Sequence, residues 1–176
     1  GKGILLFAYG SEDSTRKHYL GEAIVSARRV KALNPDVNIT LVTNPGFMPD
    51  INDTFDVVMN VKAEYMLEGK VPAWKNNGIK QQWLTRLEYL ARTPYEVTLA
   101  LDSQALCCSS AVNDMLTQGL GGFDIAFAVQ GPTTLKPHNW AIMYLVNDRT
   151  LKMFNRWRIL HIAKGKSGSD QVRYNI

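Results

Sequence analysis

Hydrophobic residues along the chain form two kinds of pattern: short continuous apolar runs, and stretches in which apolar residues recur every three or four positions. The runs predict strands at 3–10, 37–43, 55–61, 94–101, 123–129 and 140–146, of which 55–61 is the more exposed. The helical spacing predicts helices at about 15–33, 77–92, 111–119 and 149–163. Strands and helices follow one another along the whole chain, so we expect one α/β domain over 1–176 that opens with a Rossmann-like half.

Short polar motifs bound these helices. Proline ends the first two because the residue before it avoids helical backbone, glycine ends the third, and an Asn-Asp pair caps the fourth. In chain order these motifs are Asn34-Pro35, Thr93-Pro94, Gly121-Gly122 and Asn147-Asp148. We expect a helical or turn segment at 50–53, loops at 62–75, 130–139 and 164–168, and the start of a last helical turn at 169–171.

Composition narrows the class of protein. With 45% hydrophobic and 20% charged residues, the chain is typical of a soluble globular protein. The longest clean apolar run, 140–146, is too short to cross a bilayer, so we expect no transmembrane segment. The Lys and Arg residues that give the net charge of +4 are scattered over several predicted helices. This distribution favours small anionic ligands over nucleic acid.

The two cysteines, Cys107 and Cys108, are adjacent in the sequence. Neighbouring cysteines rarely form a disulfide, because its geometry requires Cα atoms further apart than one trans peptide allows. We therefore expect both thiols to be reduced and buried. Reduced thiols favour a reducing compartment, and we expect a cytoplasmic protein.

The chain is organised around the stretch 94–104, PYEVTLALDSQ, in which an apolar strand leads directly into an acid. This is the pattern of a buried strand in a parallel sheet, whose carboxyl end delivers polar groups to a ligand crevice. Asp102 is the residue delivered there. Taken alone, an Asp after an apolar run is also common as a turn residue that accepts backbone N–H groups.

The stretch resembles the strand and Asp-x-Asp turn of GT-A glycosyltransferases. The match consists of a helix, a Pro94-Tyr95 corner, a Thr-Leu-x-Leu-Asp strand ending at Asp102, and a late Asp170-Gln171 pair, and it extends over about 3–171. The turn here reads Asp-Ser-Gln, so the second acid is absent. The resemblance implies a nucleotide-diphospho-sugar transferase fold, in which a Rossmann-like mixed sheet lies between two layers of helices. It also implies transfer of a sugar from a UDP- or GDP-sugar to a hydroxyl group of a glycan or other acceptor.

The resemblance also implies roles for single residues on the donor side. Asp102, and weakly the amide of Gln104, would hold Mn²⁺ or Mg²⁺, which stabilises the departing diphosphate. If the metal is weak or absent, Lys80, Lys164 or Lys166 would supply the positive charge. The residues expected to contact the donor are Ala8, Tyr9, Thr43, Lys80, Asp102, Ser103 and Gln104.

On the acceptor side, the resemblance implies that Asp170 acts as the general base of an inverting transfer. Trp140, His138 and Gln171 would line the acceptor. Purely structural roles stay open for several of these residues: core packing for Tyr9 and Trp140, a turn for Thr43, a solvated helix face for Lys80 and a helix cap for Asp170.

The sequence leaves two other functions open. A sugar nucleotidyltransferase uses a related sheet, but it needs a Gly-rich basic loop after the first strand, and 10–13 (GSED) lacks one. A domain that binds nucleotide or glycan without catalysis would explain the missing second acid. No His/Cys cluster with metal-ligand spacing, no Ser/His/Asp set, no Walker loop and no Gly-x-Gly-x-x-Gly is evident in the sequence.

Overall fold

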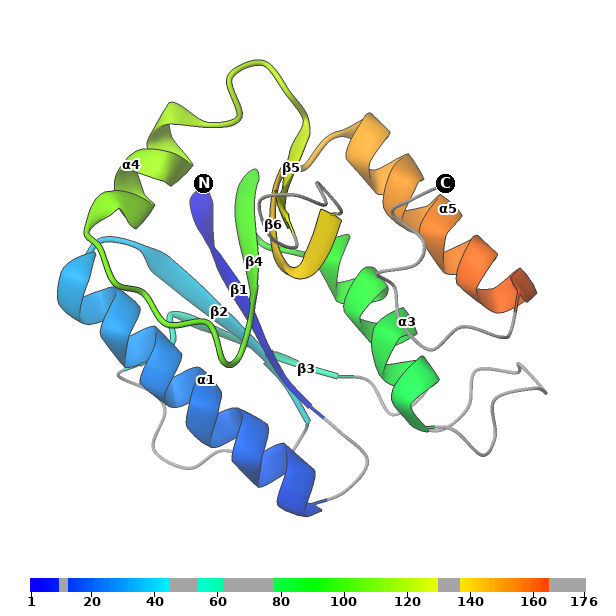
Figure 1. Ribbon diagram of the computed structural model, residues 1–176, viewed down its shortest axis with the longest axis horizontal. Coiled ribbons are helices and arrows are strands. Elements are labelled where there is room, and N and C mark those ends of the chain that lie inside the picture. The colour runs from blue at the N-terminus through cyan, green and yellow to red at the C-terminus, as the bar shows by residue number, and fades with distance from the viewer. Residues whose placement is uncertain (10–12, 45–53, 62–77, 130–136, 165–176) are drawn as a thin grey trace.

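The structure, a computed structural model, describes residues 1–9, 13–44, 54–61, 78–129 and 137–164, with backbone alone for 13–17, 78–83, 137–140 and 161–164. These residues form six strands and four helices (Figure 1). In chain order the elements are β1 (Lys2–Ala8), α1 (Asp13–Leu33), β2 (Asn38–Thr43), β3 (Val57–Asn60), α3 (Gly78–Leu90), β4 (Val97–Asp102), α4 (Ala111–Gln118), β5 (Ile125–Val129), β6 (Pro137–Leu145) and α5 (Asp148–Lys164). No helix in the described ranges has an apolar stretch long enough to cross a membrane.

The strands form one mixed sheet in the order β3-β2-β1-β4-β6-β5. β1 pairs in parallel with both β2 and β4, whereas β6 runs antiparallel to β4 and β5 antiparallel to β6. The chain leaves β1 through α1 to reach β2 on one side, and returns through α3 to β4 on the other. The order of connection therefore reverses at β1, which is where ligands bind in open α/β sheets.

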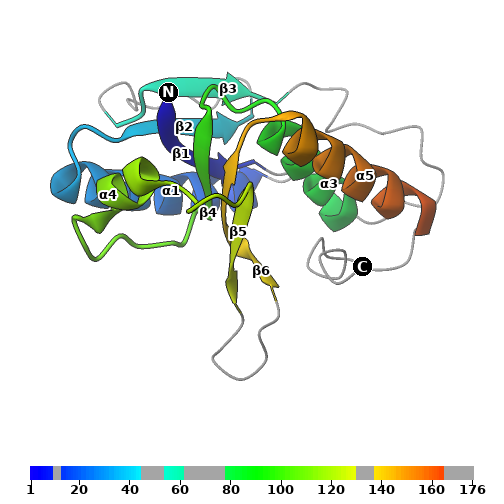
Figure 2. The same cartoon turned by 90° about the horizontal axis from the view of Figure 1, so that it is seen from above.

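The sheet separates two layers of helices, α1 with α4 and α3 with α5 (Figures 1 and 2). On the face that we call the α1 face, alternate residues of β1 pack with α1 and α4; on the opposite α3 face, the intervening residues pack with α3 and α5. Ile4, Leu6 and Ala8 lie on the α1 face, and Leu5 and Phe7 on the α3 face. This alternation follows from the two-residue period of a strand and explains why β1 is one continuous apolar run.

Each predicted strand and helix falls on an observed one. The apolar residues expected to form the stripe of α1 include Leu20, Ala23, Ala27 and Val30, all of which are buried. β3 is partly exposed, as its sequence predicts. The segments expected at 50–53 and 62–75, and the last helical turn at 169–171, lie outside the described residues.

The last strand begins earlier than the sequence predicts. The expected loop ended at residue 139, but β6 starts at Pro137, which pairs with Val129 across the β5–β6 hairpin. A break in the register after Phe127 lets the two strands continue pairing. Proline is tolerated at the first position of a strand, so its presence in 130–139 did not exclude pairing.

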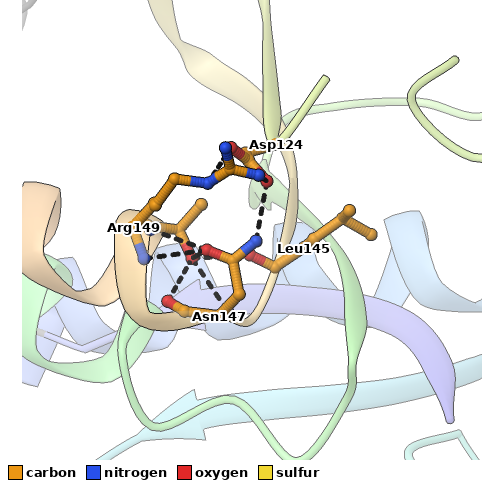
Figure 3. Close-up of polar contacts among 5 residues, drawn as sticks. Asp124, Leu145, Asn147 and Arg149 are labelled. Atoms are coloured by element: carbon orange, nitrogen blue, oxygen red, sulfur yellow. Dashed lines mark hydrogen bonds and ion pairs between the residues drawn. The ribbon is translucent and has the colours of Figure 1, made fainter. Parts of the chain in front are cut away.

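The start of α5 is fixed as the sequence predicts (Figure 3). The side-chain oxygen of Asn147 accepts hydrogen bonds from the backbone N–H groups of Arg149 (2.9 Å) and Thr150 (3.0 Å), and the hydroxyl of Thr150 accepts one from the N–H of Asn147 (3.1 Å). Asn147 Nδ2 also donates to Asp124 (2.7 Å), whose other oxygen pairs with Arg149 (2.8 Å). The start of α5 is thus tied to the residue before β5.

Tyr95 joins three strands at the corner before β4. Its phenol oxygen accepts a hydrogen bond from Thr40 of β2 (2.7 Å), and its ring lies against Gly3 of β1. Burial raises the pKa of the Tyr95 phenol above its usual range, because it disfavours the charged form. A Cβ atom at position 3 would lie 2.4 Å from the Tyr95 ring, so only glycine fits under the ring in this arrangement.

We therefore expect Gly3→Ala to destabilise the protein by about 1–3 kcal/mol, because the buried ring has to move. The matched control is Gly21→Ala on α1, where nothing lies within 4 Å of the new Cβ. There the same substitution should stabilise the helix by about 0.5–1 kcal/mol. Urea unfolding of both variants measures the two effects, and an unchanged or raised stability for Gly3→Ala would contradict the Tyr95 contact.

Candidate functional site

A cavity of about 270 Å³ opens where β1 and β4 end. Its lining comes from the ends of these two strands, from α1 and from α3. The lining residues are Phe7, Tyr9, Tyr19, Arg86, Asp102, Ser103 and Gln104. The cavity therefore lies at the reversal point of the sheet, beside the acid that the sequence indicates.

The alternation of β4 continues into the turn and divides it between the two faces. Ala100 lies in the core of the α3 face and Leu99 in that of the α1 face. Asp102 accordingly contacts α3, and Ser103 contacts α1. In the parallel register Asp102 is paired with Phe7, so an acid and an aromatic ring lie side by side on the α3 face.

Arg86 of α3 lies against this pair and is only 5% exposed. Its Nη1 donates to Asp102 Oδ1 at 2.5 Å, and its guanidinium carbon lies 4.7 Å from the centre of the Phe7 ring. A buried charge is costly unless it is paired, and the Asp102 carboxylate and the ring face both offset that cost. The arrangement places a fixed positive charge on the wall of the cavity.

The rest of the turn is bound to a carboxylate on α1. Ser103 Oγ donates to Glu22 Oε2 (2.9 Å), and Gln104 Nε2 donates to Glu22 Oε1 (3.1 Å). The imidazole of His18 lies 3.1 Å from the same carboxylate, one helical turn earlier. Glu22 therefore fixes the two residues that follow Asp102.

Polar residues of α1, and Asn34 just after it, hold the chain that follows the turn. Their side chains donate to the carbonyl oxygen of every second residue in this segment. The contacts are Ser26 to Ala105 (2.5 Å), Arg29 to Cys107 (3.1 Å) and Asn34 to Ser109 (3.1 Å). This segment is thereby fixed on the surface of α1 rather than inside a layer.

The two cysteines lie in this surface segment. Both are free thiols, as expected, but the expected burial is wrong: Cys107 is half-buried and Cys108 is exposed. The reason is that the segment rests on the outside of α1, so that only one of two neighbouring side chains can face the helix. Cys107 faces it, within 3.6 Å of the Asn34 amide nitrogen.

The expected donor residues divide into two groups. Tyr9, Asp102, Ser103 and Gln104 line the cavity together. The side chains of Ala8 and Thr43 are buried instead, and Thr43 Oγ1 donates to the Ala8 carbonyl oxygen (2.8 Å), joining the ends of β1 and β2.

Other expected site residues are described in part or not at all. Lys80 lies in the first turn of α3, and His138 and Trp140 lie in β6, with backbone alone described for all three. Asp170 and Gln171, like Lys166, lie outside the described residues, and Lys164 is the last residue of α5. Their proposed roles stay predictions.

The sequence interpretation missed Phe7, Tyr19, Glu22 and Arg86. Arg86 left a signal, because it lies three residues after Trp83 and four before Leu90, within the apolar stripe of the predicted helix. A basic residue inside such a stripe is either buried with a partner or aimed into a site. Glu22 left none, since it is one of several charged residues on α1.

The described residues at Asp102 do not fit a divalent cation. Asp102 is the only carboxylate among the described lining residues, and one of its oxygens already accepts from a buried guanidinium. Gln104 directs its amide nitrogen to Glu22. No group of three or more His, Cys, Asp or Glu side chains suited to a metal ion occurs in the part of the chain that the structure describes.

The sequence matches no protein-family model and no curated protein. The fold, in contrast, is similar to solved glycosyltransferases. One is the galactosyltransferase LgtC in complex with donor and acceptor sugar analogs, with a TM-score of 0.61 and 12% identity over 98% of this chain and 69% of LgtC.

Two further structures are similar. The glycosyltransferase GlyE of Streptococcus pneumoniae TIGR4 has a TM-score of 0.64 and 12% identity, over 99% of this chain but only 42% of GlyE. The PaToxG glycosyltransferase has a TM-score of 0.56 and 14% identity, over 98% of this chain and 67% of PaToxG. The chain therefore has the α/β fold of the GT-A glycosyltransferases.

Proposed function

We propose that this chain transfers a sugar from a nucleoside diphosphate sugar to a hydroxyl acceptor. The observation that carries the proposal is the cavity at the ends of β1 and β4, where aromatic side chains and a buried guanidinium lie together. Aromatic faces suit a nucleobase, and a fixed cation suits a diphosphate. The fold shared with LgtC, whose structure holds donor and acceptor sugar analogs, supports the same conclusion.

In the proposed reaction the acceptor oxygen forms a bond to the anomeric carbon of the sugar. The bond from that carbon to the diphosphate breaks, and its electron pair leaves with the diphosphate oxygen. Positive groups fixed near the diphosphate stabilise this developing charge. The proton of the acceptor hydroxyl passes to Asp170, while Gln171, His138 and Trp140 contact the acceptor. Lys80 belongs to the donor side, whereas Ala8 and Thr43 support that side from within the core.

One observation favours a second candidate, a domain that binds a nucleotide sugar without transferring it. The residue in place of the second acid, Gln104, is hydrogen-bonded to Glu22. Assaying the wild-type protein with UDP- and GDP-sugars and a panel of glycan acceptors separates the two candidates. Formation of the glycosylated product supports transfer, whereas binding of UDP or GDP without product supports the binding domain.

The aromatic wall gives a prediction for donor binding. Tyr9→Ala should weaken the binding of UDP or GDP roughly 5- to 100-fold, because stacking of one base on an aromatic ring is worth about 1–3 kcal/mol. Phe123→Ala is the matched control, since Phe123 is 71% exposed and does not line the cavity. Calorimetric titration measures both affinities, and equal affinities for the two variants would remove Tyr9 from the base site.

The acceptor side gives a separate prediction. Asp170→Asn keeps the size of the side chain but cannot take a proton, so transfer should fall on the order of 10²- to 10⁴-fold. The affinity for UDP or GDP and the melting temperature should stay nearly unchanged, because Asn caps a helix about as well as Asp does. Asp114→Asn on the exposed surface of α4 is the control. Near wild-type transfer by Asp170→Asn would exclude a general-base role for Asp170.

A further inference from the structure

A donor bound in the cavity needs a positive group that neutralises its diphosphate. A diphosphate needs a cation close to its oxygens, and the GT-A resemblance implies a divalent metal at the Asp-x-Asp turn. Among the described residues that line the cavity, Arg86 is the only cation. Its guanidinium is buried over the Phe7 ring and held by Asp102, so it is already in place before a ligand arrives.

The Asp102 carboxylate is already paired with Arg86, and this pairing disfavours a metal ion at the same group. Its side chain is 39% exposed, yet Oδ1 lies 2.5 Å from Arg86 Nη1. A divalent ion bound to this carboxylate would lie close to the guanidinium, and the two positive charges would repel each other. A metal would also have to compete for an oxygen that forms a charge-assisted hydrogen bond.

The turn itself cannot easily supply a second ligand beside Asp102. Because Asp102 faces α3 and Ser103 faces α1, the side chains of the turn separate toward the two layers. Ser103 and Gln104 both donate to Glu22, whose carboxylate belongs to α1. Gln104, the residue in place of the second acid, is therefore hydrogen-bonded to a helix on the α1 face, whereas Arg86 lies on the α3 face.

We propose that Arg86, without a divalent metal, neutralises the diphosphate of the donor, and that Asp102 is the positioning residue that orients Arg86. This inference rests on the proposed function, because it names the charge that the donor would meet in the same cavity. It assigns Arg86 direct contact with the diphosphate. It also changes the role of Asp102 from that of a metal ligand to that of a partner whose own negative charge opposes the diphosphate.

The first measurement is the affinity of the wild-type protein for UDP and for GDP, by calorimetric titration, in EDTA and in Mn²⁺. The proposal predicts that at least one nucleotide binds in EDTA, and that Mn²⁺ changes its affinity by less than about 3-fold. Binding that requires Mn²⁺ would overturn this inference and leave the proposed function standing. Failure of both nucleotides to bind in both buffers would overturn the proposed function, and this inference with it.

Asp102→Asn separates the two roles of Asp102 by the direction of its effect. Asn keeps an oxygen that accepts from Arg86 but removes the negative charge. The nucleotide should therefore bind as tightly as to the wild type, or more tightly, in EDTA. A metal ligand at this position predicts the reverse, and a loss of more than about 10-fold in the presence of Mn²⁺ would overturn the inference.

Arg86→Met tests the cation itself, and it should weaken nucleotide binding on the order of 10- to 100-fold in both buffers. Arg86→Lys keeps the charge without the planar fork, so it should recover part of that loss. Arg28→Met, on the exposed side of α1 and outside the cavity, is the matched control and should bind normally. If Arg86→Met does not fold, the sign of the Asp102→Asn effect still decides the question.

Discussion

The buried guanidinium of Arg86 is the constraint on which the candidate site depends. A charge that is only 5% exposed must be compensated where it lies, and the compensation comes from two neighbouring strands, the Phe7 ring of β1 and the Asp102 carboxylate of β4. Both lie on the same face because the parallel register pairs these two residues. The same two contacts therefore hold α3 on the sheet and fix the positive charge at the cavity. Removing either Phe7 or Asp102 would leave the guanidinium without part of its compensation.

The second constraint is the two-residue period of β4, which divides the Asp-Ser-Gln turn between the layers. Asp102 belongs to the α3 face, whereas Ser103 and Gln104 bind Glu22 of α1. The segment that follows is held on α1 by the side chains of Ser26, Arg29 and Asn34. A shift of α1 would thus move the turn, so the two helices on opposite faces together determine the shape of the cavity.

The sequence predicts most of the fold because its strongest signals are local. β1 and β4 are buried on both faces and read as continuous apolar runs, and Asn147 caps α5 through bonds to residues two and three positions away. The start of β6 at Pro137 was missed because it depends on pairing with β5, not on its own polar residues. The site is less predictable, since Arg86 and Asp102 are brought together by the packing of α3. The contacts of Glu22 and the exposure of Cys108 both depend on how the segment after β4 rests on α1. No local sequence pattern encodes that placement.

The central claim is that the cavity at Asp102 receives a diphosphate on Arg86. A crystal structure of the protein grown with UDP or GDP in the presence of Mn²⁺, with the ion located by its anomalous scattering, tests it most directly. The account predicts diphosphate oxygens within hydrogen-bond distance of Arg86, the base against Tyr9, and no anomalous peak between the nucleotide and Asp102. A manganese ion coordinated by Asp102 and the diphosphate, with Arg86 turned away from both, would contradict the account.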